Sequence, residues 1–200
     1  MNRRLALPVL AVTATALVLT GCTAKHRGSA APAPTATGDS SSSAPSTGAA
    51  PRVPSPLKTS KIEANACDTL SSTDRGDLKL DGGAPRQGPA GPSCTYLEAA
   101  DPGNQIDVTT VTANKNGLSD VYDTKANDEY FGETQIGGYP AVFAAVKDYR
   151  HDGQCGLWIG VTDQLAVQIM VQYGHGPGVQ DPCGVATKFG EAVVSTLKVG

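Results

Sequence analysis

The fold of this chain is decided by the stretch Cys155-Gly-Leu-Trp-Ile-Gly-Val-Thr-Asp-Gln-Leu-Ala-Val-Gln-Ile-Met-Val-Gln-Tyr173. Apolar residues occupy the odd positions on both sides of a polar centre, a pattern typical of two half-buried strands. A three-residue loop pairs Val161 with Leu165 and keeps both apolar rows on one face, whereas a two-residue loop would separate them. The pattern therefore predicts a hairpin in which 157 faces 169 and 155 faces 171.

The even positions of this hairpin carry a candidate binding surface. Trp158, the only tryptophan, lies between two glycines on that face, opposite Gln168 and diagonal to Met170. It is either a structural seat for another helix, such as residues 118 to 130, or a platform for a ligand or partner. In the second case Gln168 and Gln172 supply polar contacts. The candidate surface is thus Trp158, Gln168, Met170 and Gln172.

The hairpin also predicts the disulfide pairing of the domain. Apart from Cys22, the chain has four cysteines, for which three pairings exist. The chain leaves the hairpin beside Cys155 and reaches Cys183 twelve residues after position 171, so these two are expected to pair. Cys67 and Cys94 then pair by exclusion. Because there is no Cys-x-x-Cys and no ligand-like histidine spacing, we expect no metal and no cofactor.

The rest of the domain predicts three helices and three more strands. The expected helices begin after Ser71, run through Leu118 to Tyr122, and extend from Pro182 with apolar residues at 185, 189, 193 and 197. The expected strands are 94–98 and 105–112, around a turn at 101–104, and 133–146, interrupted at its glycines. The order lacks βαβ units. It predicts an α+β fold: a mainly antiparallel sheet of about five strands, a C-terminal helix on one face, one or two shorter helices and two disulfides.

The N-terminus predicts export and lipid anchoring. Arg3 and Arg4 precede a 15-residue apolar run, which is too short to span a membrane. Leu19-Thr20-Gly21-Cys22 then resembles a bacterial lipobox, at which a signal peptide is removed before the cysteine. We therefore expect residues 1–21 to be a lipoprotein signal peptide. Cys22 is expected to carry the lipid and hold the protein on the outer face of the cell membrane, where disulfides persist.

Composition separates a linker from a domain. Of residues 23 to 60, 30 of 38 are Ala, Pro, Ser, Thr or Gly, which predicts a disordered linker over 22–60 and a single domain over 61–200. The first 60 residues hold 6 basic and 1 acidic residue, whereas the other 140 hold 10 basic and 18 acidic residues. Such an acidic domain excludes nucleic acid as a partner, because it lacks the cationic surface that phosphates require.

Several residues of the domain together carry a family resemblance. They are Cys67 at the head of a short helix, Cys94 two residues before Tyr96, the step Gly138-Tyr139-Pro140-Ala141, Cys155, and Asp181-Pro182-Cys183. In this combination the chain resembles the actinobacterial secreted lipoproteins grouped as domain of unknown function thirty-five fifty-eight. The resemblance implies a secreted, lipid-anchored domain with disulfides, and it brings no established activity.

Candidate catalytic residues are sparse. His151 and His175 fall in expected turns, without a recognisable nucleophile or partner carboxylate, and are interpreted as exposed loop residues. The acidic residues from Asp120 to Glu129 lack the spacing of a calcium loop. The sequence therefore predicts a non-catalytic envelope module that binds a small ligand or an envelope protein. The alternative is an envelope hydrolase whose site is not recognisable from the sequence.

Overall fold

The computed structural model describes residues 49–200. The predicted signal peptide, Cys22 and the linker up to residue 48 lie outside the described residues. Within the described part, no helix combines the length and the apolar character needed to cross a membrane.

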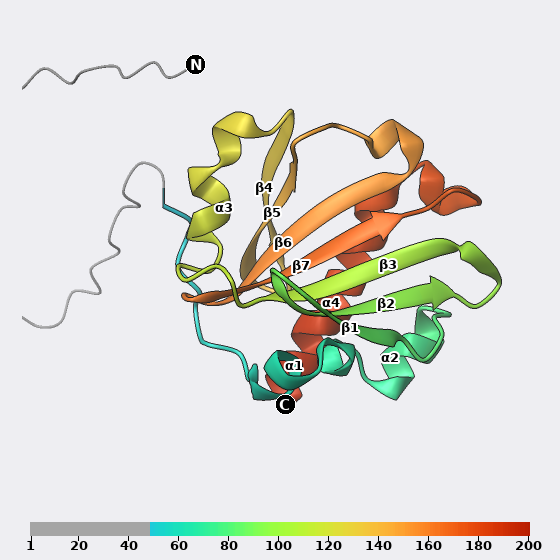
Figure 1. Cartoon of the computed structure of the whole chain (residues 1–200), viewed down its shortest axis with the longest axis horizontal. Helices are drawn as coiled ribbons and strands as arrows, with labels where there is room; N and C mark the ends of the chain where they lie inside the picture. Colours follow the sequence, from blue (N-terminus) through green and yellow to red (C-terminus); the bar gives the residue numbers. More distant parts are fainter. Residues whose placement is uncertain (1–48) are drawn as a thin grey trace, which may run out of the picture. The chain divides into compact units, whose positions relative to one another are not determined.

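The described residues form an α+β fold built on one sheet (Figure 1). The α-helices are α1 (Ser60–Ala64), α2 (Ser72–Asp77), α3 (Ser119–Asp123) and α4 (Pro182–Val199). The strands are β1 (Ala84–Gly88), β2 (Gly91–Glu98), β3 (Asp101–Val111), β4 (Tyr130–Ile136), β5 (Tyr139–Ala145), β6 (Gln154–Thr162) and β7 (Leu165–Gln172). Short 3₁₀ segments lie at Ala66–Thr69, Lys125–Asn127, Arg150–Asp152 and Pro177–Val179.

The sheet consists of two antiparallel meanders joined at the centre. Its spatial order is β1-β2-β3-β7-β6-β5-β4, and all six pairings are antiparallel. The first meander is β1-β2-β3. The chain then crosses through α3 to the far edge and returns through β4, β5 and β6, so that β7 pairs with β3. This order explains why the predicted hairpin is central: β6 and β7 each have a strand on both sides.

The register of the central hairpin is confirmed, although its loop differs from the prediction. Leu157 pairs with Ile169 and Cys155 pairs with Val171. The turn, however, has two residues between Thr162 and Leu165, and a bulge at residue 161 restores the alternation. The backbone N–H of Leu57 donates to the carbonyl of residue 161 at 2.9 Å. A distant segment thus provides the hydrogen bond for the carbonyl of the bulged residue, and the local sequence pattern alone could not show this contact.

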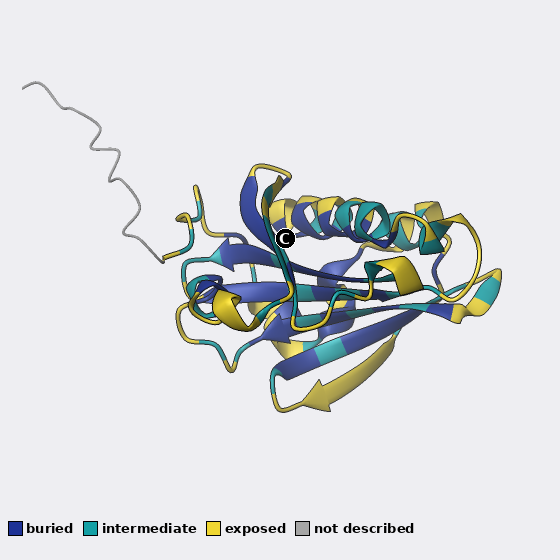
Figure 2. Cartoon of the chain, turned by 90° about the horizontal axis from the view of Figure 1, so that it is seen from above, coloured by how far each residue is buried: buried dark blue, intermediate teal, exposed yellow. Residues whose placement is uncertain are grey.

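Helix α4 covers one face of the sheet, as the sequence predicts (Figure 2). Phe189, Val193 and Leu197 are buried, and they pack on the odd row of the central hairpin. Gly190 lets the helix approach closely, because a Cβ there would lie 3.0 Å from Ile159 Cδ1 and 3.1 Å from a Leu157 methyl group. The main core therefore lies between α4 and β6–β7.

The expected strand count of about five is too low, because the sheet has seven strands. The predicted interrupted strand 133–146 is the β4–β5 hairpin, whose turn residues Gly137 and Gly138 both have positive φ, at 56° and 86°. Strand β1 was missed because its five residues are all exposed and show no apolar alternation. The turn expected at 101–104 also belongs to a strand, since β3 begins at Asp101.

Residues 50–60 pack on the domain, although their composition predicts linker. Leu57 is buried, with 8% of its surface exposed, and joins the main core. The N–H of Val53 donates to the Asp163 carboxylate at 3.0 Å, and Arg52 pairs with the same carboxylate at 2.8 Å. One leucine and five long-range polar contacts, from Arg52, Val53, Leu57 and Lys58, anchor a segment that is otherwise rich in Pro and Ser. The packed region therefore begins about ten residues before the predicted boundary.

Both predicted disulfides are confirmed. Cys67 is bonded to Cys94, and Cys155 is bonded to Cys183. The first bridge attaches the 3₁₀ segment Ala66–Thr69 to β2, and the second attaches the start of α4 to β6. Each bridge fixes a helical segment to an internal strand of the sheet.

Candidate functional site

The sheet face opposite α4, which we call the open face, carries the predicted binding residues. On β6 it presents Trp158 between two glycines, and on β7 it presents Gln168, Met170 and Gln172. Trp158 pairs with Gln168 on one side and with Val142 of β5 on the other, as the hairpin register requires. All four predicted residues are half-buried.

Helix α3 covers the open face at the β4–β5 end. Leu118, Val121 and Tyr122 recur on one stripe and are buried against the strands. With Val142 and Ala144 they form a second apolar cluster, against which Trp158 and Phe131 pack. One side of Trp158 is therefore seated next to the α3 cluster, while part of its surface stays accessible. The packing agrees with the structural seat, and the accessible part of Trp158 is the surface that the platform interpretation would use.

A polar network lies on the part of the open face that β2, β3 and β7 form. Its centre is Asp107, which is opposite Met170 in the β3–β7 ladder. The Thr95 hydroxyl donates to one carboxylate oxygen of Asp107, and the side-chain amides of Gln105 and Gln172 donate to the other at 3.2 Å. The sequence identified Gln172 but missed the others. The sequence pattern that could have indicated this network is the alternation of polar residues at 105, 107 and 109 with Ile106 and Val108.

A pocket of about 300 Å³ opens at the end of the sheet where β5 and β6 separate, and we call it the fork pocket. The β5–β6 ladder stops at the pair Phe143–Leu157, whereas β4–β5 continues to Ala145 and β6–β7 continues to Gln154. Its lining residues are Tyr130, Ala145, Val146, Lys147, Tyr149, Arg150, Gln154, Cys155, Gly156 and Met170. Met170 is shared with the predicted surface, but the pocket itself was not predicted.

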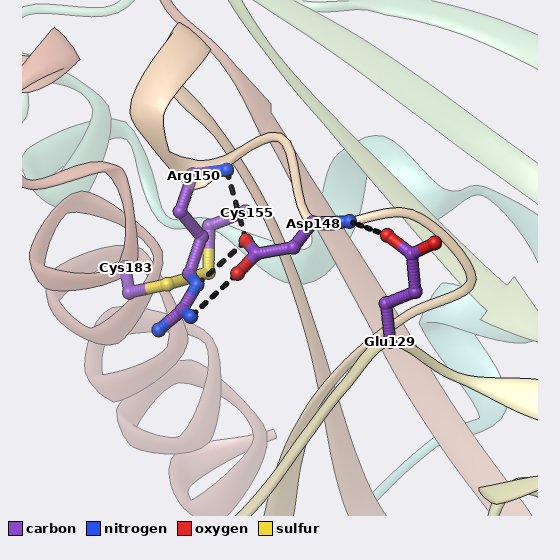
Figure 3. Close-up of polar contacts among 5 residues, drawn as sticks. All are labelled: Glu129, Asp148, Arg150, Cys155 and Cys183. Atoms are coloured by element: carbon purple, nitrogen blue, oxygen red, sulfur yellow. Dashed lines mark hydrogen bonds and ion pairs between the residues drawn. A yellow bond between two sulfur atoms is a disulfide. The ribbon is translucent and has the colours of Figure 1, made fainter. Parts of the chain in front are cut away.

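The charges around the fork pocket are paired with one another. Figure 3 shows the Asp148–Arg150 pair and the backbone N–H of Asp148 that donates to Glu129. Arg150 donates to both carboxylate oxygens of Asp148, at 2.8 and 2.7 Å, and its guanidinium lies 3.4 Å from the centre of the Tyr130 ring. These hydrogen bonds lower the pKa of Asp148 to about 2. Lys147 pairs with Glu129, which lowers the pKa of Glu129 and raises that of Lys147.

A second cleft of about 570 Å³ lies between α2, the β2–β3 turn and the start of α4. Asp77, Glu98, Asp101 and Asp181 line it together with apolar residues, and His175 lies at 3.6 Å from Asp101. The buried Asn104 holds the adjoining loop: its amide oxygen accepts the N–H groups of residues 174 and 175, and its amide nitrogen donates to Glu98 and to the carbonyl of His175.

The remaining sequence candidates fall outside both cavities. His151 is exposed and lies 3.2 Å from Asp152. Asp120 accepts hydrogen bonds from the backbone N–H groups of Lys115 and Asn116 and from the Asn116 amide, which lowers its pKa. It therefore orders the loop before α3. Among the described residues, no group of three or more His, Cys, Asp or Glu side chains is placed to hold a metal ion.

These features define a class: a disulfide-bearing α+β domain in which one sheet face is covered by a helix and the other is largely open. The chain belongs to the family described as protein of unknown function (DUF3558), whose family model matches residues 17–196. The match includes the Leu-Thr-Gly-Cys segment and the whole sheet. No curated protein and no solved structure matches the chain.

Proposed function

We propose that the protein is a lipid-anchored module of the cell envelope that binds a partner protein through the open face and catalyses no reaction. The observation that carries this proposal is the half-buried row of Trp158, Gln168 and Met170 on a sheet face that α3 covers at one end. Interface centres are enriched in tryptophan and methionine and depleted in charge. The charged residue beside this row, Asp107, has both carboxylate oxygens occupied by neighbouring donors.

Two features support the proposed location. Two disulfides favour an oxidising compartment outside the cytoplasm. The lipobox-like Leu19-Thr20-Gly21-Cys22 favours a lipid anchor at Cys22. Cys22→Ala is expected to abolish labelling by a fatty-acid analogue and to move the protein from the membrane to the soluble fraction. Unchanged labelling would exclude Cys22 as the anchor.

Site-specific photocrosslinking in intact cells tests the binding surface. p-Benzoylphenylalanine in place of Gln168 is expected to give a discrete higher-mass adduct with another envelope protein. The matched control carries the same group in place of Glu191, which is exposed on the outer side of α4. Identical adducts from both positions, or none from Gln168, would contradict the proposal. Turnover of ester or glycoside substrates by the purified protein would instead support a hydrolase.

A further inference from the structure

The fork pocket lies where the backbone of the sheet divides, and the segment from Val146 to Arg150 completes its lining. Beyond the pair Phe143–Leu157, the β4–β5 hairpin and the β6–β7 hairpin diverge (Figure 1). Each hairpin keeps its own ladder to the end, so the walls on both sides are hydrogen-bonded strands. A Cβ at Gly156 would lie 2.8 Å from the carbonyl oxygen of Ala144 and 3.3 Å from the terminal methyl of Met170, so glycine at this position lets the β5 backbone pass close to β6 beside the pocket. The concave site is therefore largely preformed.

The walls of the fork pocket are mainly apolar and unusually exposed. Tyr130, Val146, Tyr149 and Met170 contribute most of the large side chains. Three large apolar residues of the described chain are exposed, and two of them, Val146 at 64% and Tyr149 at 48%, lie here. Exposed apolar residues gathered at a pocket indicate a binding site more strongly than the same residues scattered over the surface.

The electrostatics of the pocket select against a charged ligand. Lys147 is engaged by Glu129, and Arg150 is held by Asp148 through two hydrogen bonds and lies on the Tyr130 ring. The four charges cancel pairwise. An anionic ligand would have to compete with Glu129 or Asp148 for the cation that each binds. A cationic ligand would have to displace Lys147 or Arg150 from its carboxylate. Either would also lose its hydration on entering an apolar pocket.

We propose that the fork pocket binds one uncharged, mainly apolar small molecule, such as an aromatic ring system. Its volume of about 300 Å³ is at the lower end of the range for small-molecule sites. Tyr149, which is 48% exposed, offers a ring for stacking, and Gln154 offers a polar contact. This site goes beyond the proposed partner-binding function, because it lies at the end of the sheet and shares only Met170 with that surface.

Two dyes with the same ring system test the charge selectivity. N-phenyl-1-naphthylamine is uncharged, and 8-anilinonaphthalene-1-sulfonate adds one anionic group. Both are titrated into the chain from residue 22 onward with Cys22→Ala, so that no acyl chain or detergent competes. We expect the uncharged dye to bind with one-to-one stoichiometry and at least tenfold more tightly than the sulfonate. Energy transfer from Trp158 reports that the dye binds the domain, and the substitutions described next test where it binds.

Two matched substitutions test the location. Val146→Lys places a charge at the pocket wall, and Val199→Lys places it at a residue that is 78% exposed at the end of α4. Because both positions are exposed, neither change removes core packing. We expect Val146→Lys to weaken binding of the uncharged dye at least tenfold and Val199→Lys to leave it unchanged. Circular dichroism confirms that both variants are folded, and Ala145→Trp, which fills the pocket from β5, provides a second blocking variant.

Three results would overturn the proposal. They are equal affinity for both dyes, equal effects of the two lysine variants, and dye binding that appears only with self-association in sedimentation velocity. The last would show that Val146 and Tyr149 contact a second copy of the chain. Failure of the Gln168 crosslink leaves these titrations unaffected, so the two proposals can fail separately.

Discussion

Replacing Trp158 with alanine tests how the open face is built. Val142 and the α3 cluster pack against one side of this tryptophan, whereas its neighbours along the strand, Gly156 and Gly160, have no side chains to cover it. We take about 150 Å² as buried, out of the 150 to 250 Å² that a large aromatic buries. At about 25 cal/mol per Å², this area corresponds to about 4 kcal/mol as an upper bound. A compact unfolded state lowers the expected loss to about 2 to 3 kcal/mol.

Urea unfolding monitored by far-ultraviolet circular dichroism measures this loss, since the variant has no tryptophan. The midpoint should fall at unchanged slope, and the melting temperature should drop by about 5 to 10 °C for a domain of this size. Gln168→Ala is the matched control on the facing strand. It removes a half-buried polar side chain and should cost less than about 1 kcal/mol. In the wild type, acrylamide should quench Trp158 partially.

Either extreme would refute this account of Trp158. A loss below about 1 kcal/mol would mean that the α3 cluster does not support the indole, which would then be a display platform alone. A loss above about 4 kcal/mol with no acrylamide quenching would mean that the indole is fully enclosed. In that case it could not contact a partner, and the binding surface would have to exclude it.

Three further predictions concern stability. Replacing Cys155 and Cys183 together with alanine should lower the free energy of unfolding in urea by about 3 to 4 kcal/mol, because their bridge spans 28 residues; a loss under about 1 kcal/mol would contradict this. Leu57→Ala should cost about 2 to 3 kcal/mol and accelerate proteolysis within residues 50–60, whereas unchanged protection would show that the segment is not anchored there. Because Arg150 lowers the pKa of Asp148 from 3.8 to about 2, their pairing stabilises the fold above about pH 4, and this contribution is lost as the pH falls toward 2. NMR titration of the carboxyl group should place the pKa of Asp148 near 2 in the wild type, and Arg150→Gln should return it toward 3.8. Equal pKa values in the wild type and the variant would refute the pairing.

The central hairpin and the Cys155–Cys183 bridge were predictable because the information is local, and the Cys67–Cys94 bridge then followed by exclusion. Alternation over residues 155–173 fixes which side chains share a face, and the parity of the loop fixes the register. The loop itself was predicted wrongly, since the bulge at Val161 is satisfied by Leu57, about a hundred residues away. The hairpin sequence alone shows that both apolar rows share one face. The bulge that brings this about, however, is stabilised by a hydrogen bond from the distant Leu57.

Strand β1 escaped prediction because it lacks the local signal of burial. All residues of β1 are exposed, so pairing with β2 alone makes it a strand. In the β4–β5 hairpin, Gly137-Gly138 is a turn signal, but Pro140 nearby favours a bulge or an edge. The Asp107 network illustrates the same limit for the site. Its donors come from three strands, and their adjacency depends on β7 pairing with β3.

The fork pocket could not be predicted because it results from how two helices hold one hairpin. Helix α4 holds the turn of β4–β5: Lys198 donates to the carbonyl of Gly137 at 2.9 Å and lies 5.4 Å from the centre of the Tyr139 ring. At the other end, Ala144 packs on the opposite face, in the α3 cluster. The two ends of the hairpin are thus held from opposite faces of the sheet, and its pairing with β6 ends at Phe143. An apolar pocket at this point is therefore a consequence of the packing of both helices, and it should persist when no ligand is bound.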